Sequence, residues 1–130
     1  MATTIYAKSF TWNSITFSAA SNGLLRIEYD HRGEALPDWV GDDEYPKTVF
    51  VVRKVLRVRV ACREFKITTT PGTGNSNGVA VVKGKAGDTT MTFAALLLVG
   101  VGGNQDSNAP SETVLEFMHE SSDGQASPVS

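Results

Sequence analysis

The chain has 130 residues, of which 41% are hydrophobic, so it suits a single globular domain that can bury a core of its own. Its formal net charge is -2, which argues against a general nucleic-acid-binding protein because such proteins usually carry a basic excess. Cys62 is the only cysteine, which excludes an intrachain disulfide and fits a reducing compartment.

Turn-forming residues punctuate the chain and β-branched residues fill the segments between them, so we expect an all-β or mainly β protein. The expected strands cover residues 5–11, 15–19, 24–32, 48–67, 79–83, 89–101 and 113–120. Extended segments joined by short turns, without crossover helices, predict an antiparallel β-sandwich or barrel. At most one short helix is expected, near residues 35–40, where Pro37 and Gly41 keep it brief.

One β-sandwich domain is expected over residues 1–120, followed by a flexible C-terminal tail over residues 121–130, which has no apolar periodicity. A tight turn is expected at Ala86, Gly87 and Asp88, between two strands of a hairpin. The longest apolar run, residues 93–101, is far shorter than the ~20 residues needed to cross a bilayer, and the N-terminus lacks the pattern of a signal peptide. We therefore expect no membrane association.

The stretch RKVLRVRVACR, residues 53–63, alternates between apolar and basic residues for most of its length. In an extended chain the two sides of this stretch hold Val58, Val60 and Cys62 on one side and Arg57, Arg59 and Arg63 on the other. The whole segment 48–67 is longer than a common strand, and its apolar residues change parity after Cys62. This change predicts a bulge or a strand end near Arg63 and Glu64.

The preceding segment, LLRIEYDHR over residues 24–32, alternates in the same way, and we expect it to pair antiparallel with segment 48–67. The apolar residues of both segments then share a core face, and Glu28 and Asp30 lie among Arg53, Arg57 and Arg59 on the opposite face. Opposite charges directly across an antiparallel pair stabilise it by roughly 0.2 to 1 kcal/mol each. We therefore predict a mixed charged face, which either is simply solvated or lines a channel or groove through which a polyanion passes.

The connection between these two segments, residues 35–46, combines large apolar and acidic side chains. Its apolar members are Leu36, Trp39, Val40 and Tyr45, and its acidic members are Asp38, Asp42, Asp43 and Glu44. A Trp in such a loop packs on something. Two interpretations stay open: Trp39 caps the end of its own sandwich, or the loop contacts a partner, since aromatic residues inside a charged rim are typical of interface hot spots.

The order of these parts resembles the tail-tube proteins of bacteriophages and the related contractile injection tubes. A turn-and-strand opening, TWNSITFS, is followed by the strand GLLRIEYDHRGE with alternating charge, the protruding loop ALPDWVGDDEYPKT and the long return strand VFVVRKVLRVRVACREF. A Gly-rich turn, TPGTGNSNG, leads to the hairpin GVAVVKGKAGDTTMTFAALLLVGV and the last strand, SETVLEFMHESSDG. The resemblance covers about residues 10–124 and is a pattern of elements without an invariant signature.

This resemblance implies a structural virion protein whose β-sandwich subunits form hexameric rings that stack into a hollow tube for DNA delivery. The implied lumen face consists of Arg26, Glu28, Asp30, Arg53, Arg57, Arg59 and Arg63. The loop over residues 35–46 would reach the next ring. The implied location is the virion tail, after synthesis in the host cytoplasm. The implied partners are further copies of the chain, sheath, tape-measure and baseplate proteins, and DNA that passes without specific binding.

Catalytic and cofactor chemistry is not expected. The candidates are His31, His119 and Cys62, which come from separate segments without the spacing of a metal site, and Cys62 shares the parity of buried residues. The Gly-rich stretch GTGNSNG lacks the Lys-Ser/Thr of a phosphate-binding loop. We therefore expect neither an enzyme nor a cofactor. The alternative function is a monomeric β-sandwich module that binds carbohydrate or another ligand, although such a module should gather aromatic residues in one concave site.

Overall fold

A computed structural model describes residues 3–20, 23–63, 70–72, 74–84, 86–106, 109–120 and 128–129. These residues form eight strands and no helix: β1 (Thr3–Ile5), β2 (Ser9–Trp12), β3 (Ile15–Ser18), β4 (Leu24–Asp38), β5 (Thr48–Cys62), β6 (Ser76–Gly84), β7 (Gly87–Asp106) and β8 (Ala109–His119). The all-β prediction is confirmed. The sequence predicts at most one short helix, near residues 35–40, and none forms there, because β4 continues through Ala35 and Pro37 and pairs with Val51 and Val49.

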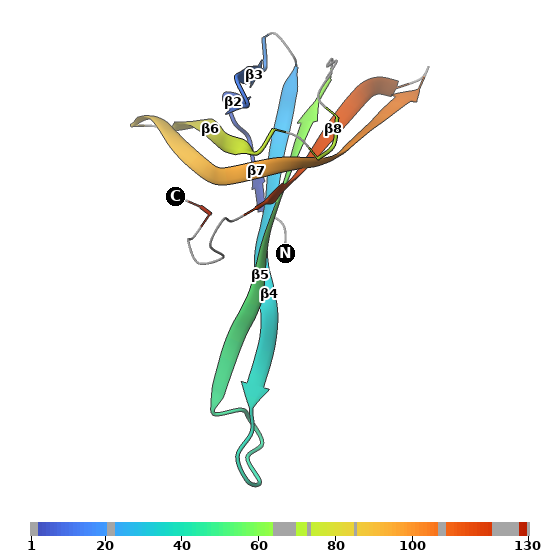
Figure 1. The fold of residues 1–130 in the computed structure, drawn as a ribbon. Helices are drawn as coiled ribbons and strands as arrows, with labels where there is room; N and C mark the ends of the chain where they lie inside the picture. The colour runs from blue at the N-terminus through green and yellow to red at the C-terminus, as the bar shows by residue number, and fades with distance from the viewer. Residues whose placement is uncertain are drawn as a thin grey trace.

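All eight strands belong to one antiparallel sheet in the order β1-β4-β5-β8-β7-β6-β2-β3. The expected strand over residues 5–11 is in fact two strands, since β1 pairs with β4 and β2 pairs with β6. The long strand β7 pairs with β6 over its first half and with β8 over its second half (Figure 1). The tight turn joins Gly84 to Gly87, one residue earlier than expected, and Gly87 has a φ of 122° that favours glycine.

The sheet folds over on itself, so that one of its faces encloses the core. Strands β2 and β8 are three positions apart in the sheet, which in a flat sheet would separate them by ~14 Å. Yet the rings of Trp12 and Phe117 lie 4.8 Å apart, and those of Tyr29 and Phe93 lie 5.5 Å apart across an equal number of strands. The indole Nε1–H of Trp12 also donates a buried hydrogen bond of 3.0 Å to the carbonyl oxygen of Leu96. The two halves of the sheet therefore pack face to face, as in a sandwich.

The core is formed by aromatic and aliphatic side chains from both halves of the sheet. Its fully buried large members are Phe10, Trp12, Phe17, Ile27, Leu56, Val58, Val60, Phe93, Leu96, Leu98, Leu115 and Phe117. The members from β5 alternate with exposed arginines, and β5 ends at Cys62, so the predicted alternation and strand end are both confirmed. A register shift at Leu25 places Leu24, rather than Leu25, in the core.

Two residues of the expected C-terminal tail lie on the sheet. Pro128 is buried and its carbonyl oxygen accepts a 2.7 Å hydrogen bond from the N–H of Ala94, and Val129 forms an isolated bridge with Phe93. These two residues therefore differ from the flexible tail that the sequence predicts. The rest of that tail, residues 121–127 and 130, lies outside the described residues.

Strands β4 and β5 extend together well beyond the rest of the sheet (Figure 1). Among the described residues, β1 pairs with β4 no further along the hairpin than Tyr29, and β8 pairs with β5 no further than Arg57. In the part of the chain that the structure describes, the far part of this hairpin is therefore a two-stranded ribbon. We refer to residues 33–54 as the arm. The loop predicted over residues 35–46 is thus partly strand, and the loop in the structure is shorter and lies between Asp38 and Thr48.

Candidate functional site: an ionic face and a projecting arm

The side of the sheet opposite the core carries a group of charged residues on β4, β5 and β8. Antiparallel pairing sets Glu28 opposite Arg59 and Asp30 opposite Arg57. The two acids thus lie among arginines of β5, as the sequence predicts. Pairing of β5 with β8 then sets Glu116 beside Arg59. We refer to this group as the ionic face; it consists of Arg26, Glu28, Asp30, Arg32, Arg57, Arg59, Glu112 and Glu116. Its four basic and four acidic side chains cancel in charge.

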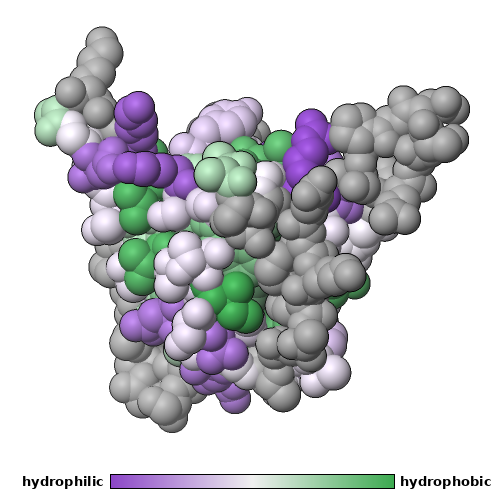
Figure 2. Space-filling model, turned by 90° about the horizontal axis from the view of Figure 1, so that it is seen from above, coloured by the Kyte–Doolittle hydropathy of each residue, from purple (hydrophilic) through white to green (hydrophobic). Residues whose placement is uncertain are grey.

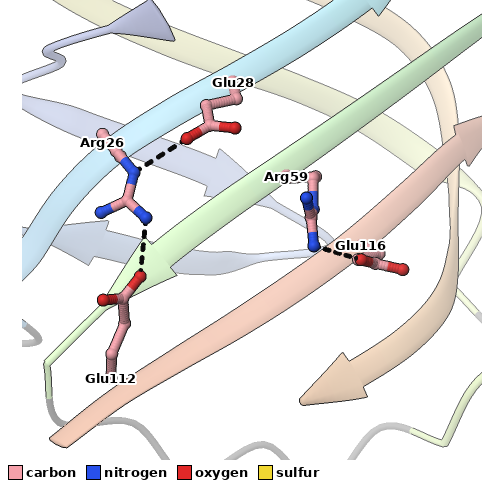
Figure 3. Close-up of polar contacts among 5 residues, drawn as sticks. All are labelled: Arg26, Glu28, Arg59, Glu112 and Glu116. Carbon is pink, nitrogen blue, oxygen red and sulfur yellow. Dashed lines mark hydrogen bonds and ion pairs between the residues drawn. The ribbon is translucent and has the colours of Figure 1, made fainter. Parts of the chain in front are cut away.

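Most of these side chains are ion-paired with one another (Figure 3). Arg26 bridges two strands: its Nε lies 2.9 Å from Glu28 and its Nη2 lies 2.8 Å from Glu112 on β8. Arg59 pairs with Glu116 at 2.8 Å. These side chains are roughly one third to one half exposed, so each pair stabilises the sheet by only ~0.2 to 1 kcal/mol and is weakened by salt.

The pairs also shift the ionisation of their members. The hydrogen bond to Arg32 lowers the pKa of Asp30 below its ordinary value, and the hydrogen bond to Asp30 raises the pKa of Arg32. The hydrogen bond to Glu28 raises the pKa of Arg26. Arg57 differs, because it makes no ion pair within the described part of the chain, although its charge contributes to the lowered pKa of Asp30. The ion pairs of the face therefore favour the charged forms of Arg26, Asp30 and Arg32.

The two acids that β8 contributes, Glu112 and Glu116, are not among the site residues predicted from the sequence. A signal was present, since they alternate with the core residues Leu115 and Phe117. That alternation places them on the outer side, but it does not reveal that β8 lies beside β5. Next to these acids, glycines of β7 leave a shallow open depression of about 490 Å³, lined by Arg59, Gly100, Val101, Gly102, Gly103, Glu112, Val114 and Glu116.

The other two residues of the predicted lumen face are Arg53 and Arg63. Arg53 lies at the base of the arm, where its guanidinium is 3.6 Å from the carboxylate of Glu34. Arg63 follows the end of β5, and its N–H donates a 3.0 Å hydrogen bond to the carbonyl oxygen of Gly23. The structure thus brings Arg26, Glu28, Asp30, Arg57 and Arg59 together on the ionic face. Arg53 borders this group, since it lines one depression with Asp30 and Arg57, and Arg63 follows the end of β5.

A β-bulge separates the arm from the rest of the sheet. Residues Arg53 and Lys54 lie opposite the single residue Gly33, and Arg53 has a φ of 52°, which is uncommon for a residue other than glycine. A Cβ atom at Gly33 would lie 2.6 Å from Cγ1 of Val51 and 2.8 Å from the carbonyl oxygen of Val52. Glycine at position 33 therefore permits the close approach of the two strands that the bulge requires.

The arm exposes most of the large apolar side chains that the described residues leave on the surface. Of eleven such side chains, seven belong to the arm: Leu36, Trp39, Val40, Tyr45, Val49, Phe50 and Val51. Four of the eight residues of the predicted inter-ring contact are among them, and the others, Asp38, Asp42, Asp43 and Glu44, lie in the same part of the arm. Trp39 is 55% exposed and Tyr45 is 79% exposed, so the first interpretation, in which Trp39 caps its own sandwich, is wrong.

The other end of the molecule has a different surface. In the view from above, hydrophobic and hydrophilic residues are interspersed over the described surface (Figure 2). Buried Cys62 has a pKa raised to about 11 by desolvation, and His119 lies against the carbonyl oxygen of Ala94 through its Nδ1, at 2.5 Å. Within the described ranges, no three or more His, Cys, Asp or Glu side chains group as a metal site. No helix among the described residues is long and apolar enough to span a membrane.

Comparison with known proteins gives no further assignment. A scan against models of protein families found no match, and a search of curated proteins found none either.

Proposed function

We propose that the chain is a structural subunit that assembles with further copies of itself into rings, and that stacked rings form a hollow conduit of the phage tail-tube type. The observation that carries this proposal is the arm, a two-stranded ribbon with exposed apolar side chains that projects from the folded body (Figure 1). Contiguous exposed apolar surface on a soluble protein marks an interaction site.

The arm also leaves the edges of both its strands unpaired within the described residues. Isolated two-stranded hairpins are marginally stable at best in water, and unpaired edges readily associate with other chains. An arm of this kind is stabilised when other subunits cover it. Self-association through the arm therefore both assembles the particle and hides a surface that would otherwise aggregate.

The ionic face suits the lining of a conduit for DNA. A protein binds DNA by neutralising phosphates with lysine and arginine, and each neutralised phosphate adds to the affinity. Here Arg26 and Arg59 are already paired with acids, so few phosphates could be neutralised at once. DNA would pass along such a face without being retained.

Sedimentation velocity and negative-stain microscopy of the purified protein test the proposal. We expect rings or hollow rods that appear with increasing concentration. The double substitution Trp39→Ala with Tyr45→Ala should shorten or abolish the stacks while circular dichroism shows an unchanged fold. Tyr6→Ala is the matched control, because Tyr6 is 76% exposed but lies outside the arm.

A monomer at every concentration would contradict the proposal. A monomer that in addition shifts on binding a sugar or another small ligand would favour the alternative, a β-sandwich binding module. Stacks of normal length formed by the double variant would leave self-assembly in place and remove the loop of the arm from the inter-ring contact.

A further inference from the structure

Both faces of the arm expose large apolar side chains, although the face that bears Phe50 also carries Glu34, Asp38 and Thr48. Residues directly opposite in an antiparallel pair share a face, and neighbouring pairs alternate between faces. The pair Leu36 and Phe50 therefore lies on one face, whereas the pairs Ala35 with Val51 and Pro37 with Val49 lie on the other. Phe50 is 56% exposed and Val51 is 50% exposed. A ribbon that docks on a single surface is expected to be apolar on one face and polar on the other, so this pattern indicates cover on both sides.

Another chain would contact the arm by packing its side chains on the faces of the arm, and not by adding a strand to the edge of β4. Pro37 lies in the part of β4 that no strand other than β5 joins within the described residues, and proline has no N–H to donate to an added strand. Side-chain packing against Leu36 and Phe50 on one face and Val51 on the other needs no such donor.

Each face of the strand-paired part of the arm, without the loop between Asp38 and Thr48, is too small to hold one partner by itself. Five register pairs, from Glu34 with Val52 to Asp38 with Thr48, give a ribbon ~15 Å long and, with two strands, ~10 Å wide. The footprint of one face is thus on the order of 150 Å², several-fold below the ~800 Å² per partner of a stable interface. Contacts of this size hold only when several form together, as in a closed assembly.

Charge favours another copy of the chain as the occupant. The end of the arm, residues 38–47, carries four acids and one lysine, whereas the whole chain has a net charge of -2. The remainder of the chain therefore carries a formal charge of about +1, so the body of another copy has no net negative charge to repel the acidic end of the arm. The same acids repel nucleic acid, which excludes DNA as the partner of the arm.

We propose that in the assembled protein each arm is clamped between two other copies of the chain, one against the face that bears Phe50 and one against the face that bears Val51. This inference rests on the self-assembly proposed above and specifies its geometry. The arm then joins three subunits, and no pair of subunits is stable alone.

Single cysteine reporters on the two faces test the clamp. Cys62 is the only native cysteine, and it is buried with its pKa raised to about 11, so the native protein provides a low labelling background. The variants Phe50→Cys and Val51→Cys are labelled with a maleimide, once as dilute subunits and once in assembled particles. We expect the labelling rate at both positions to fall at least tenfold on assembly, and the wild-type protein serves as the background control.

The outcomes separate the clamp from self-assembly as such. Protection of only one of the two cysteines in assembled particles overturns the clamp and leaves one-sided docking. Full labelling of both cysteines in assembled particles shows that the arm is not an interface. Protection that requires added protein of another kind, in the absence of particles, assigns the arm to a different partner and overturns the clamp. Failure of the wild-type chain to assemble at any concentration contradicts the proposed function itself.

Discussion

Replacing Gly33 by alanine should loosen the arm and spare the body of the protein. The added Cβ would lie 2.6 Å from Cγ1 of Val51 and 2.8 Å from the carbonyl oxygen of Val52. The side chain of Val51 can turn away, but the carbonyl belongs to the backbone, so the two strands must separate at the bulge. Overpacking of this kind destabilises a structure by roughly 1–3 kcal/mol. That energy corresponds to an increase of about 5- to 150-fold in the population of the open arm.

Hydrogen exchange measured by mass spectrometry with millisecond to second labelling would detect this opening in the unassembled subunit. We expect amides of residues 48–53 to exchange faster by that factor, while residues 56–62, which β8 also pairs in part, keep their protection. Gly102→Ala is the matched control, because a Cβ at Gly102 in β7 would meet nothing within 4 Å. Unchanged exchange at residues 48–53 in the Gly33→Ala variant would refute the role given to this glycine. Equal loss of protection in both segments would show that the bulge is not a boundary.

Three further predictions concern the core and the ionic face. Trp12→Phe keeps an aromatic ring but deletes the donor to a buried carbonyl, so the free energy of unfolding in urea should fall by ~1–3 kcal/mol, and an unchanged midpoint would contradict the packing described. Arg59→Ala should lower the free energy of unfolding by ~0.2–1 kcal/mol at low salt, because Arg59 has an ion-pair partner, Glu116, at 2.8 Å. Arg57→Ala should lower it by less, and equal effects of the two variants would count against the pairing. The hydrogen bond to Arg32 lowers the pKa of Asp30, so the contribution of Asp30 to stability is present above about pH 4 and is lost as the pH falls through the folded-state pKa. An NMR titration of the carboxyl group that gives Asp30 an ordinary pKa would contradict this.

The charged side of β4 and β5 could be predicted from the sequence because a strand repeats every two residues. Alternation alone separates Val58 and Val60 from Arg57 and Arg59, and one expected hairpin places Glu28 on the same face as those arginines. The exact register comes only from the structure. The acids of β8 could not be found in that way. Their pairing with β5 joins segments more than fifty residues apart, and nothing in the local pattern specifies which distant strand lies alongside.

The strands of the arm could not be predicted from the local sequence pattern. Residues Ala35 to Asp38 do not alternate between apolar and polar side chains, and Pro37 argues against a strand. The sequence therefore predicts a loop or a short helix there. The strand forms because the bulge at Gly33 shifts the register by one residue and lets β5 continue alongside β4. This register shift depends on how the two strands pair, so the sequence of either strand alone does not reveal it.

Electron cryomicroscopy of the protein, at concentrations at which it assembles, tests most directly whether the arm is buried between copies and whether the ionic face lines a bore. We expect closed rings in which each arm is buried between neighbouring copies, with Arg57 and Arg59 directed toward a common bore. Particles in which the arm stays in solvent, or in which those arginines point to the outer surface, would contradict this arrangement.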